Sequence, residues 1–287
     1  MVLLQNRRLL LGMAAIFILP LVVTGLAFQT LATTEVTDMV IGTPLVVTPA
    51  ATNDLTPADG NATTVYQAGI VAYQAGDVVA AETAFRHVLT LIPADGDVYN
   101  SLGLALLAQD RMGEAVTALE TAVSLDPTLV EAHYNLGVAL QAEAQWTAAK
   151  TAYLNAIAVD ETFAPAYNGL GNLARDLGDN EAAVPAYEQA VVYDPALVAA
   201  YLNLGTTYAS LGEPEKATDA LETAVRLDPT HGPAHYNLGL VYTRLGHHTR
   251  ARAQWEQVLR LAPGTEWAIQ AQQQLSKGAE GQRNLGN

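Results

Sequence analysis

The chain has 287 residues, of which 50% are hydrophobic, and a formal net charge of −15. This acidic excess argues against nucleic acid as a partner, because binding to phosphates relies on well-placed Lys and Arg side chains. The chain contains no cysteine, which excludes a disulfide framework, a lipidated cysteine and a thiolate metal site.

The first elements expected along the chain are a short basic N-terminus, residues 1–8, and an uncharged apolar segment, residues 9–28. Twenty helical residues span about 30 Å, which matches the hydrocarbon core of a bilayer. No Lys or Arg occurs between Arg8 and Arg86. The positive-inside rule therefore predicts a single-pass membrane anchor, with residues 1–8 cytoplasmic and the rest extracytoplasmic.

An alternative use of residues 9–28 is a secretory signal peptide, which would leave a secreted protein. Small residues suited to cleavage occur around Ala27 and Ala32, although the apolar stretch is longer than most signals have. Residues 29–61 are rich in Thr, Pro, Ala and Asp and lack periodicity, so they are predicted to form a flexible linker. Asn61 begins a glycosylation motif that has meaning only in a eukaryotic secretory pathway.

Beyond the linker, one glycine recurs at a constant interval of 34 residues, at Gly69, Gly103, Gly137, Gly171, Gly205 and Gly239. Such a period predicts six stacked units, one to six, over residues 62–95, 96–129, 130–163, 164–197, 198–231 and 232–265. Repeat positions are counted from the first residue of each unit. Apolar residues at positions 4, 7, 8 and 11, then at 20, 24 and 27, predict two amphipathic helices per unit.

Glycine has two predicted roles within these units. The glycines at the turn between the two helices, Gly76, Gly178, Gly212 and Gly246, are expected to end the first helix with a positive φ. The period-setting glycines at position 8 lie inside helices, where each costs roughly 1 kcal/mol relative to alanine. We therefore expect close helix crossing against the alanines to recover this loss.

Further positions of the repeat carry a recognisable pattern. Position 7 is leucine in units two to six, position 20 is always alanine, position 24 is always large, and position 32 is proline except at Glu161. In these positions the chain resembles the tetratricopeptide repeat family. The resemblance implies an all-α, right-handed superhelical solenoid of six helix-turn-helix units, and a role in binding other proteins.

After unit six, residues 266–276 are predicted to form a capping helix. Trp267, Ala271 and Leu275 provide its apolar side, and the following residues, 277–287, are expected to be a disordered tail. A cap of this kind would cover the last open apolar face of the solenoid.

Residues suited to catalysis are scarce in this sequence. No nucleophile with an assigned base, phosphate-binding loop or dinucleotide motif is present, so neither enzymatic activity nor a cofactor is predicted. His231 and His235 fall in a turn and at a packing position, and no acidic cluster completes a metal site. Carboxylates such as Asp95 with Asp97, or Asp160 with Glu161, lie in turns between repeats, where a solvated or helix-capping role is expected.

The inner surface of the predicted solenoid, formed by positions 2, 5, 6, 9, 12 and 13, is the candidate binding site. Asparagine occupies position 6 in three units, and Ser101 and Gly169 interrupt the series where position 5 is asparagine instead. This arrangement is similar to the asparagine ladder with which superhelical members of the family hold extended polypeptides. The candidate peptide-binding residues are Asn135, Asn203, Asn237, Asn100, Asn168, Asn172 and Arg175.

Two other interpretations of this surface compete with peptide binding. The asparagines could satisfy local backbone groups and bind nothing, in which case the protein is a structural subunit that associates through its convex face or its ends. A basic clamp for a terminal carboxylate is disfavoured, because only Arg175 and Arg244 are available and they lie in distant units. The sequence does not indicate the identity of the partner or the oligomeric state.

Overall fold

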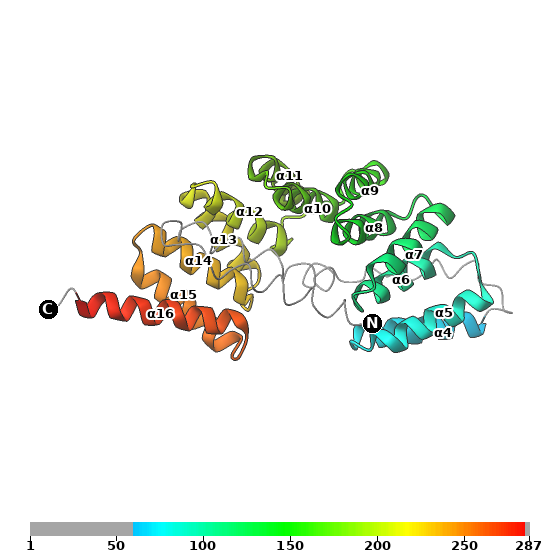
Figure 1. The fold of residues 1–287 in the computed structure, drawn as a ribbon, viewed down its shortest axis with the longest axis horizontal. Coiled ribbons are helices and arrows are strands. Elements are labelled where there is room, and N and C mark those ends of the chain that lie inside the picture. Colours follow the sequence, from blue (N-terminus) through cyan, green and yellow to red (C-terminus); the bar gives the residue numbers. More distant parts are fainter. Residues whose placement is uncertain (1–59, 285–287) are drawn as a thin grey trace, which may run out of the picture. The chain divides into compact units, whose positions relative to one another are not determined.

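The computed structural model describes residues 60–284, and every regular element in this range is a helix (Figure 1). In chain order the helices are α4 (Gly60–Gln74), α5 (Val78–Leu91), α6 (Gly96–Leu107), α7 (Met112–Leu125), α8 (Val130–Ala142), α9 (Trp146–Val159), α10 (Ala164–Asp176), α11 (Asn180–Tyr193), α12 (Val198–Ser210), α13 (Pro214–Leu227), α14 (Gly232–Arg244), α15 (His248–Leu261) and α16 (Glu266–Asn284).

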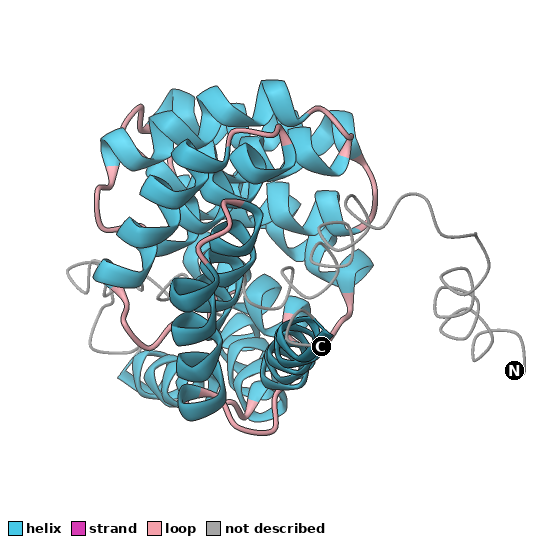
Figure 2. Cartoon of the chain, turned by 90° about the vertical axis from the view of Figure 1, so that its left-hand side faces the viewer, coloured by secondary structure: helices cyan, strands magenta, loops and turns pink. Residues whose placement is uncertain are grey.

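Helices α4 to α15 pair into six successive hairpins, one for each predicted unit, and each hairpin packs on the next. Figure 2 shows the same stack of helices from the side, with only loops and turns between them. The predicted all-α superhelical repeat fold is thus confirmed. The predicted anchor, residues 9–28, and nearly all of the linker lie outside the described residues. Within the described part, no helix is both long and apolar enough to cross a membrane.

The turn inside each hairpin uses a left-handed backbone conformation. As predicted, φ is positive at all four turn glycines, with values of 81° at Gly76, 82° at Gly178, 80° at Gly212 and 76° at Gly246. Units two and three lack this glycine, yet Asp110 and Ala144 adopt φ values of 61° and 57° at the same place. The hairpin geometry therefore imposes this conformation even where the side chain disfavours it.

Before units three, four and six, the side chain at position 4 contacts a carbonyl of the preceding turn. His133 Nε2 lies 2.9 Å from Pro127 O, and His235 Nε2 lies 3.0 Å from Pro229 O. Tyr167 OH donates across 3.0 Å to the carbonyl of Glu161, the residue that replaces the usual proline. The carbonyl at repeat position 32 therefore has a partner whether the residue is proline or glutamate, so the turn of unit three forms without proline.

Close packing at position 8 explains the period-setting glycines. A Cβ built on Gly171 would lie 2.5 Å from Cε1 of Tyr187, and one built on Gly103 would lie 2.6 Å from Cγ of Leu119. Real carbon atoms in contact are about 3.5–4.0 Å apart, so even alanine does not fit. In each case the obstructing side chain is the large residue at position 24 of the same unit. The predicted close crossing is confirmed, but the glycines pack against these large side chains and not against the alanines expected there.

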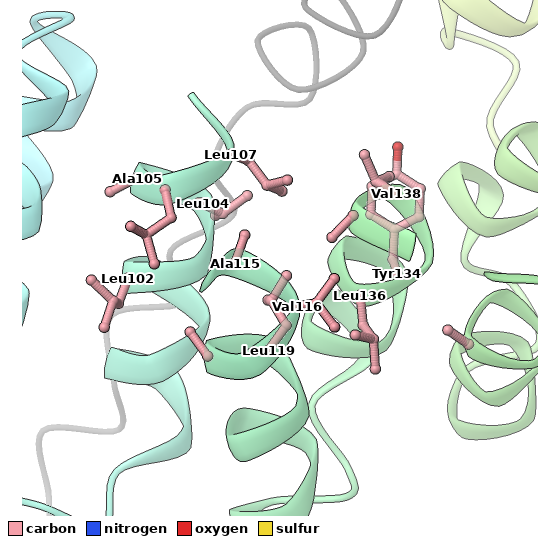
Figure 3. Packing of buried hydrophobic residues seen from close by; sticks show 14 of the residues in the cluster. Leu102, Leu104, Ala105, Leu107, Ala115, Val116, Leu119, Tyr134, Leu136 and Val138 are labelled. Carbon is pink, nitrogen blue, oxygen red and sulfur yellow. The ribbon is translucent and has the colours of Figure 1, made fainter. Parts of the chain in front are cut away.

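One cluster of buried apolar side chains runs without interruption from α4 to α10. Figure 3 shows side chains of α6, α7 and α8 meeting, with Val116 and Leu119 of α7 between the residues of its two neighbours. In units two to five the first helix is packed between two hairpins, and the second helix buries one face. Because each hairpin is covered by its neighbours, stability is expected to depend on contacts between adjacent units.

Helix α16 covers the last hairpin. The rings of Trp267 and Tyr236 are 5.4 Å apart, and Ala268 and Ala271 are buried. The helix continues to Asn284 instead of ending at Ser276, so most of the segment expected to be a disordered tail is helical. Good helix formers such as Lys, Ala, Glu and Gln dominate this extension, which accounts for the difference.

Candidate peptide-binding surface

Polar side chains at positions 5 and 6 of the first helices meet across the junctions between units. Tyr66 OH and Ser101 Oγ are 2.8 Å apart at the first junction. Asn135 Nδ2 donates to Asn100 Oδ1 across 2.9 Å at the second junction. In both pairs, position 6 of one unit bonds to position 5 of the preceding unit, 35 residues earlier.

The fourth junction holds the largest group of predicted site residues. Asn203 Nδ2 donates to Asn168 Oδ1 and to Asn172 Oδ1, both across 3.0 Å. Tyr187 OH donates to the same Asn172 oxygen across 2.6 Å, and Arg175 Nη1 lies 3.3 Å from Asn203 Oδ1. Units four and five therefore share one hydrogen-bonded cluster.

The third junction has no such pair because Gly169 occupies position 6. A Cβ on Gly169 would lie 2.7 Å from Cε1 of Tyr153, so this ring fills the space that an asparagine side chain would need. Tyr153 OH donates instead to Gln141 Oε1 across 2.7 Å. Gln141 in turn donates to Asp176 Oδ2 across 2.6 Å, which provides a different polar link between units three and four.

At the fifth junction, Asn237 has no polar residue at position 5 of the preceding unit. Its Nδ2 donates to Pro233 O across 2.9 Å within α14. Its Oδ1 is buried and has no hydrogen-bond partner in the part of the chain that the structure describes. Position 5 of the preceding unit is Leu202, which cannot donate a hydrogen bond. Asn237 is only 2% exposed, so this oxygen is a buried acceptor left unsatisfied by the described residues.

The structure thus places the seven predicted residues in two bonded groups and one separate position. The five asparagines other than Asn100 are buried, between 1% and 8% exposed, and Asn100 and Arg175 are half-buried. An asparagine amide offers two donor hydrogens and an acceptor oxygen. The Asn135–Asn100 bond uses neither the oxygen of Asn135 nor the NH2 group of Asn100. Both bonded groups therefore link adjacent units. In the Asn100–Asn135 pair, one amide oxygen and one NH2 group are not used by this link.

Sequence reasoning missed several participants in these groups. Tyr66, Ser101 and Gln141 all bond across a junction or support a residue that does. The signal that identifies the first two is a polar pair separated by 35 residues, at positions 5 and 6 of adjacent units. Gln141 has no comparable signal, because its role depends on the direction of the Tyr153 hydroxyl.

Acidic side chains gather at the start of α6. Burial raises the pKa of the Asp97 carboxyl, and the nearby carboxylates of Asp95, Asp126 and Glu131 raise it further. Asp95 also caps α6, since its Oδ1 accepts from Val98 N across 3.1 Å. A ligand that approaches this end of units two and three meets negative charge, which disfavours an acidic peptide there.

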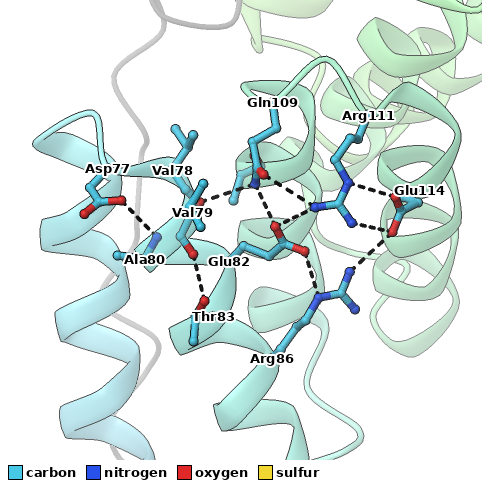
Figure 4. Close-up of polar contacts among 11 residues, drawn as sticks. Asp77, Val78, Val79, Ala80, Glu82, Thr83, Arg86, Gln109, Arg111 and Glu114 are labelled. Carbon is cyan, nitrogen blue, oxygen red and sulfur yellow. Dashed lines mark hydrogen bonds and ion pairs between the residues drawn. The ribbon is translucent and has the colours of Figure 1, made fainter.

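A second polar network joins the second helix of unit one to the turn between α6 and α7 and to α7 itself (Figure 4). Arg111 donates to Glu82 and to Glu114, each across 2.6 Å, and Gln109 donates to Glu82 across 2.8 Å. Burial raises the pKa of Glu82, but hydrogen bonds from Arg111, Gln109 and Arg86 outweigh it and lower the value to about 2. This network ties the first unit to the array.

The histidines show no arrangement suited to a metal ion. His235 makes its two contacts with Pro229 O and Gln254 Oε1, and His231 lies 3.7 Å from Asp228 Oδ2. Across residues 60–284, no three His, Asp or Glu side chains come together in a possible metal site. Asp160 accepts from Thr162 N and Oγ1 across 2.9 Å and 2.8 Å, so it stabilises the turn before α10 without capping that helix.

Comparisons with known proteins bear on the repeats. A model described as "Tetratricopeptide repeat" matches residues 134–195, 168–232 and 202–265, and one described as "TPR repeat" matches residues 105–143. Together these matches span more than half of the chain. No curated protein sequence matches the chain.

Solved structures with a similar fold include PilF of Pseudomonas aeruginosa, which is 16% identical with a TM-score of 0.64 and covers 76% of this chain and 100% of its own. The yeast Tom70 structure is 19% identical, with a TM-score of 0.65 over 77% of this chain and 47% of its own. The Cut9-Hcn1 hetero-tetramer of APC/C is 18% identical, with a TM-score of 0.66 over 94% of this chain and 51% of its own. At these identities the likeness concerns the fold.

Proposed function

Because the chain belongs to the tetratricopeptide repeat family, whose members generally act as non-enzymatic interaction modules, we propose that it binds an extended peptide segment of a partner protein along its inner surface. Residues 9–28 are proposed to anchor it in a membrane with the repeats on the extracytoplasmic side. The partner is proposed to be a protein, with no role for nucleic acid or a cofactor.

The observation that carries this proposal is the alignment of amide groups at the junctions. The Asn100–Asn135 pair and the Asn168–Asn203–Asn172 group come from the first helices of successive units and occupy equivalent places in the stack. In the Asn100–Asn135 pair, the NH2 group of Asn100 and the oxygen of Asn135 are not used by the bond and can serve a ligand. Repeated amides suit a peptide backbone, which presents a donor and an acceptor at every residue.

Substitution of Asn100 by aspartate gives a selective test. Aspartate keeps the oxygen that accepts from Asn135 Nδ2 and loses the NH2 group that is proposed to donate to a peptide carbonyl. Loss of one hydrogen bond is worth about 0.5–1.5 kcal/mol, so affinity should fall roughly two- to tenfold while the fold is retained. Asn155→Asp on α9, an exposed position, is the matched control for the change in charge.

The partner would first be captured with the full-length chain in detergent, and its peptide segment then titrated by fluorescence anisotropy. Circular dichroism on each variant checks that the helices are intact. Equal affinity of Asn100→Asp and Asn155→Asp for the segment would place binding elsewhere than at the Asn100–Asn135 pair.

A second candidate is a structural subunit of a membrane-associated assembly that uses its convex face or its ends. The observation in its favour is that the asparagines are largely buried and bond to one another, so they serve the array itself. Under this reading Asn100→Asp leaves partner capture unchanged. Substitutions on exposed residues of the second helices or of α4 then abolish it.

A further inference from the structure

In units two to six, the preceding hairpin covers one face of the first helix. Positions 7 and 10 lie on this face, and their residues are buried, as with Leu102 and Ala105 in unit two and Leu238 and Val241 in unit six. In unit one the equivalent residues are Ala68 and Val71 of α4, and both are exposed. Val71 is 64% exposed, although its counterparts in the other units are nearly inaccessible.

The two ends of the array therefore differ. At the far end, α16 covers the last hairpin through Trp267, Ala268 and Ala271. At the near end, the described residues leave the face of α4 uncovered. A second copy cannot stack head-to-tail, because the end that would receive α4 is already occupied by α16. Two copies can still meet through their α4 faces about a two-fold axis, which makes a closed, isologous contact.

The charge distribution supports a contact between copies at this place. No charged residue occurs in α4 from Gly60 to Gln74, although the chain as a whole has a net charge of −15. Copies that met through most other surfaces would bring acidic side chains together, which is unfavourable.

We propose that the α4 face, defined by Ala68 and Val71 of α4 and by Ala75 directly after its end, is a homodimer interface. These residues are spaced three and four apart, so they lie on one side of the helix. The alanines on either side of Val71 are small, which lets two antiparallel α4 helices approach closely, with each Val71 near its symmetry mate. This contact leaves the inner surfaces of both copies available, so it is independent of peptide binding there.

The absence of cysteine makes a cross-linking test clean, because one introduced cysteine reports on one position. Full-length Val71→Cys in detergent should form a disulfide-linked dimer on mild oxidation, seen on a non-reducing gel. Val192→Cys is the matched control, since Val192 on α11 is 65% exposed but lies away from the proposed interface. We expect at least tenfold faster cross-linking of Val71→Cys than of the control.

Light scattering on purified full-length chain gives the second arm of the test. The unmodified chain should have the mass of a dimer, Val71→Glu that of a monomer with unchanged helix content, and Val192→Glu that of a dimer. The proposal is overturned by a monomeric unmodified chain, by a dimer that survives Val71→Glu, or by equal cross-linking of the two cysteine variants. A Val71→Cys thiol that resists both oxidation and alkylation would show that another segment or partner covers the face, which also overturns it.

Discussion

A single methyl group added at Gly171 tests how closely the two helices of a unit cross. The new Cβ would lie 2.5 Å from Cε1 and 2.6 Å from Cδ1 of Tyr187. This ring is fully buried, and its hydroxyl bonds to Asn172, so it cannot swing away. To restore contact distances near 3.5 Å, the two helices would have to move apart by about 1 Å.

The expected magnitude follows from two opposing effects. Overpacking a core costs about 1–3 kcal/mol, and the locked ring of Tyr187 places Gly171→Ala near the upper value. Alanine gains up to about 1 kcal/mol in helix propensity over glycine. The net expectation is a loss of about 2 kcal/mol in the free energy of unfolding.

Gly113→Ala on α7 is the matched control, because no atom lies within 4 Å of the Cβ it would add. This variant should be more stable than the unmodified chain by up to about 1 kcal/mol. Urea unfolding followed by circular dichroism measures both, and hydrogen exchange shows whether the loss in Gly171→Ala centres on α10 and α11. If Gly171→Ala is as stable as Gly113→Ala, the close-crossing argument is wrong.

Three further changes should alter the urea midpoint in defined directions. The pKa of Glu82 is lowered from 4.5 to about 2, so ionised Glu82 stabilises the folded state above pH 4.5 and this contribution is lost as pH falls toward 2. Glu82→Gln should remove this pH dependence and lower the free energy of unfolding at neutral pH by at most about 3 kcal/mol. Leu202→Asn should supply a donor to Asn237 Oδ1 and stabilise by about 0.5–1.5 kcal/mol, whereas Leu202→Asp, which has no donor, should not. Ala144→Gly should stabilise by about 1 kcal/mol, because it relieves the positive φ of 57°.

The fold was predictable because each feature of the hairpin depends on residues close in sequence. The interval between glycines set the repeat length, and the turn glycines such as Gly178 marked the ends of the first helices. The tight contact between Gly171 and Tyr187 lies within one unit, so it recurs wherever the local pattern recurs. Ala144 shows the limit of this reasoning, since the hairpin imposes a positive φ on a residue that gives no sign of it.

The pairing of polar residues across the junctions was harder to predict, because it depends on two units at once. Position 6 alone suggested a row of equivalent asparagines facing a ligand. The structure shows that Asn135 and Asn203 each bond to a position 5 asparagine, whereas Gly169 gives way to the ring of Tyr153. A tyrosine also occupies position 24 in unit four, yet there its hydroxyl supports Asn172. Sequence alone does not reveal which way each ring points.

This difference matters for how the inner surface is tested. The position 6 amides are unequal, since those of Asn135 and Asn203 donate to a neighbour and the buried oxygen of Asn237 has no partner among the described residues. Replacing all three by alanine would therefore remove bonds between units as well as bonds to a peptide. A loss of binding in that variant would not separate the two effects. Aspartate at Asn100 does separate them, because it retains the acceptor that the array uses and removes only the donor that is free for a ligand.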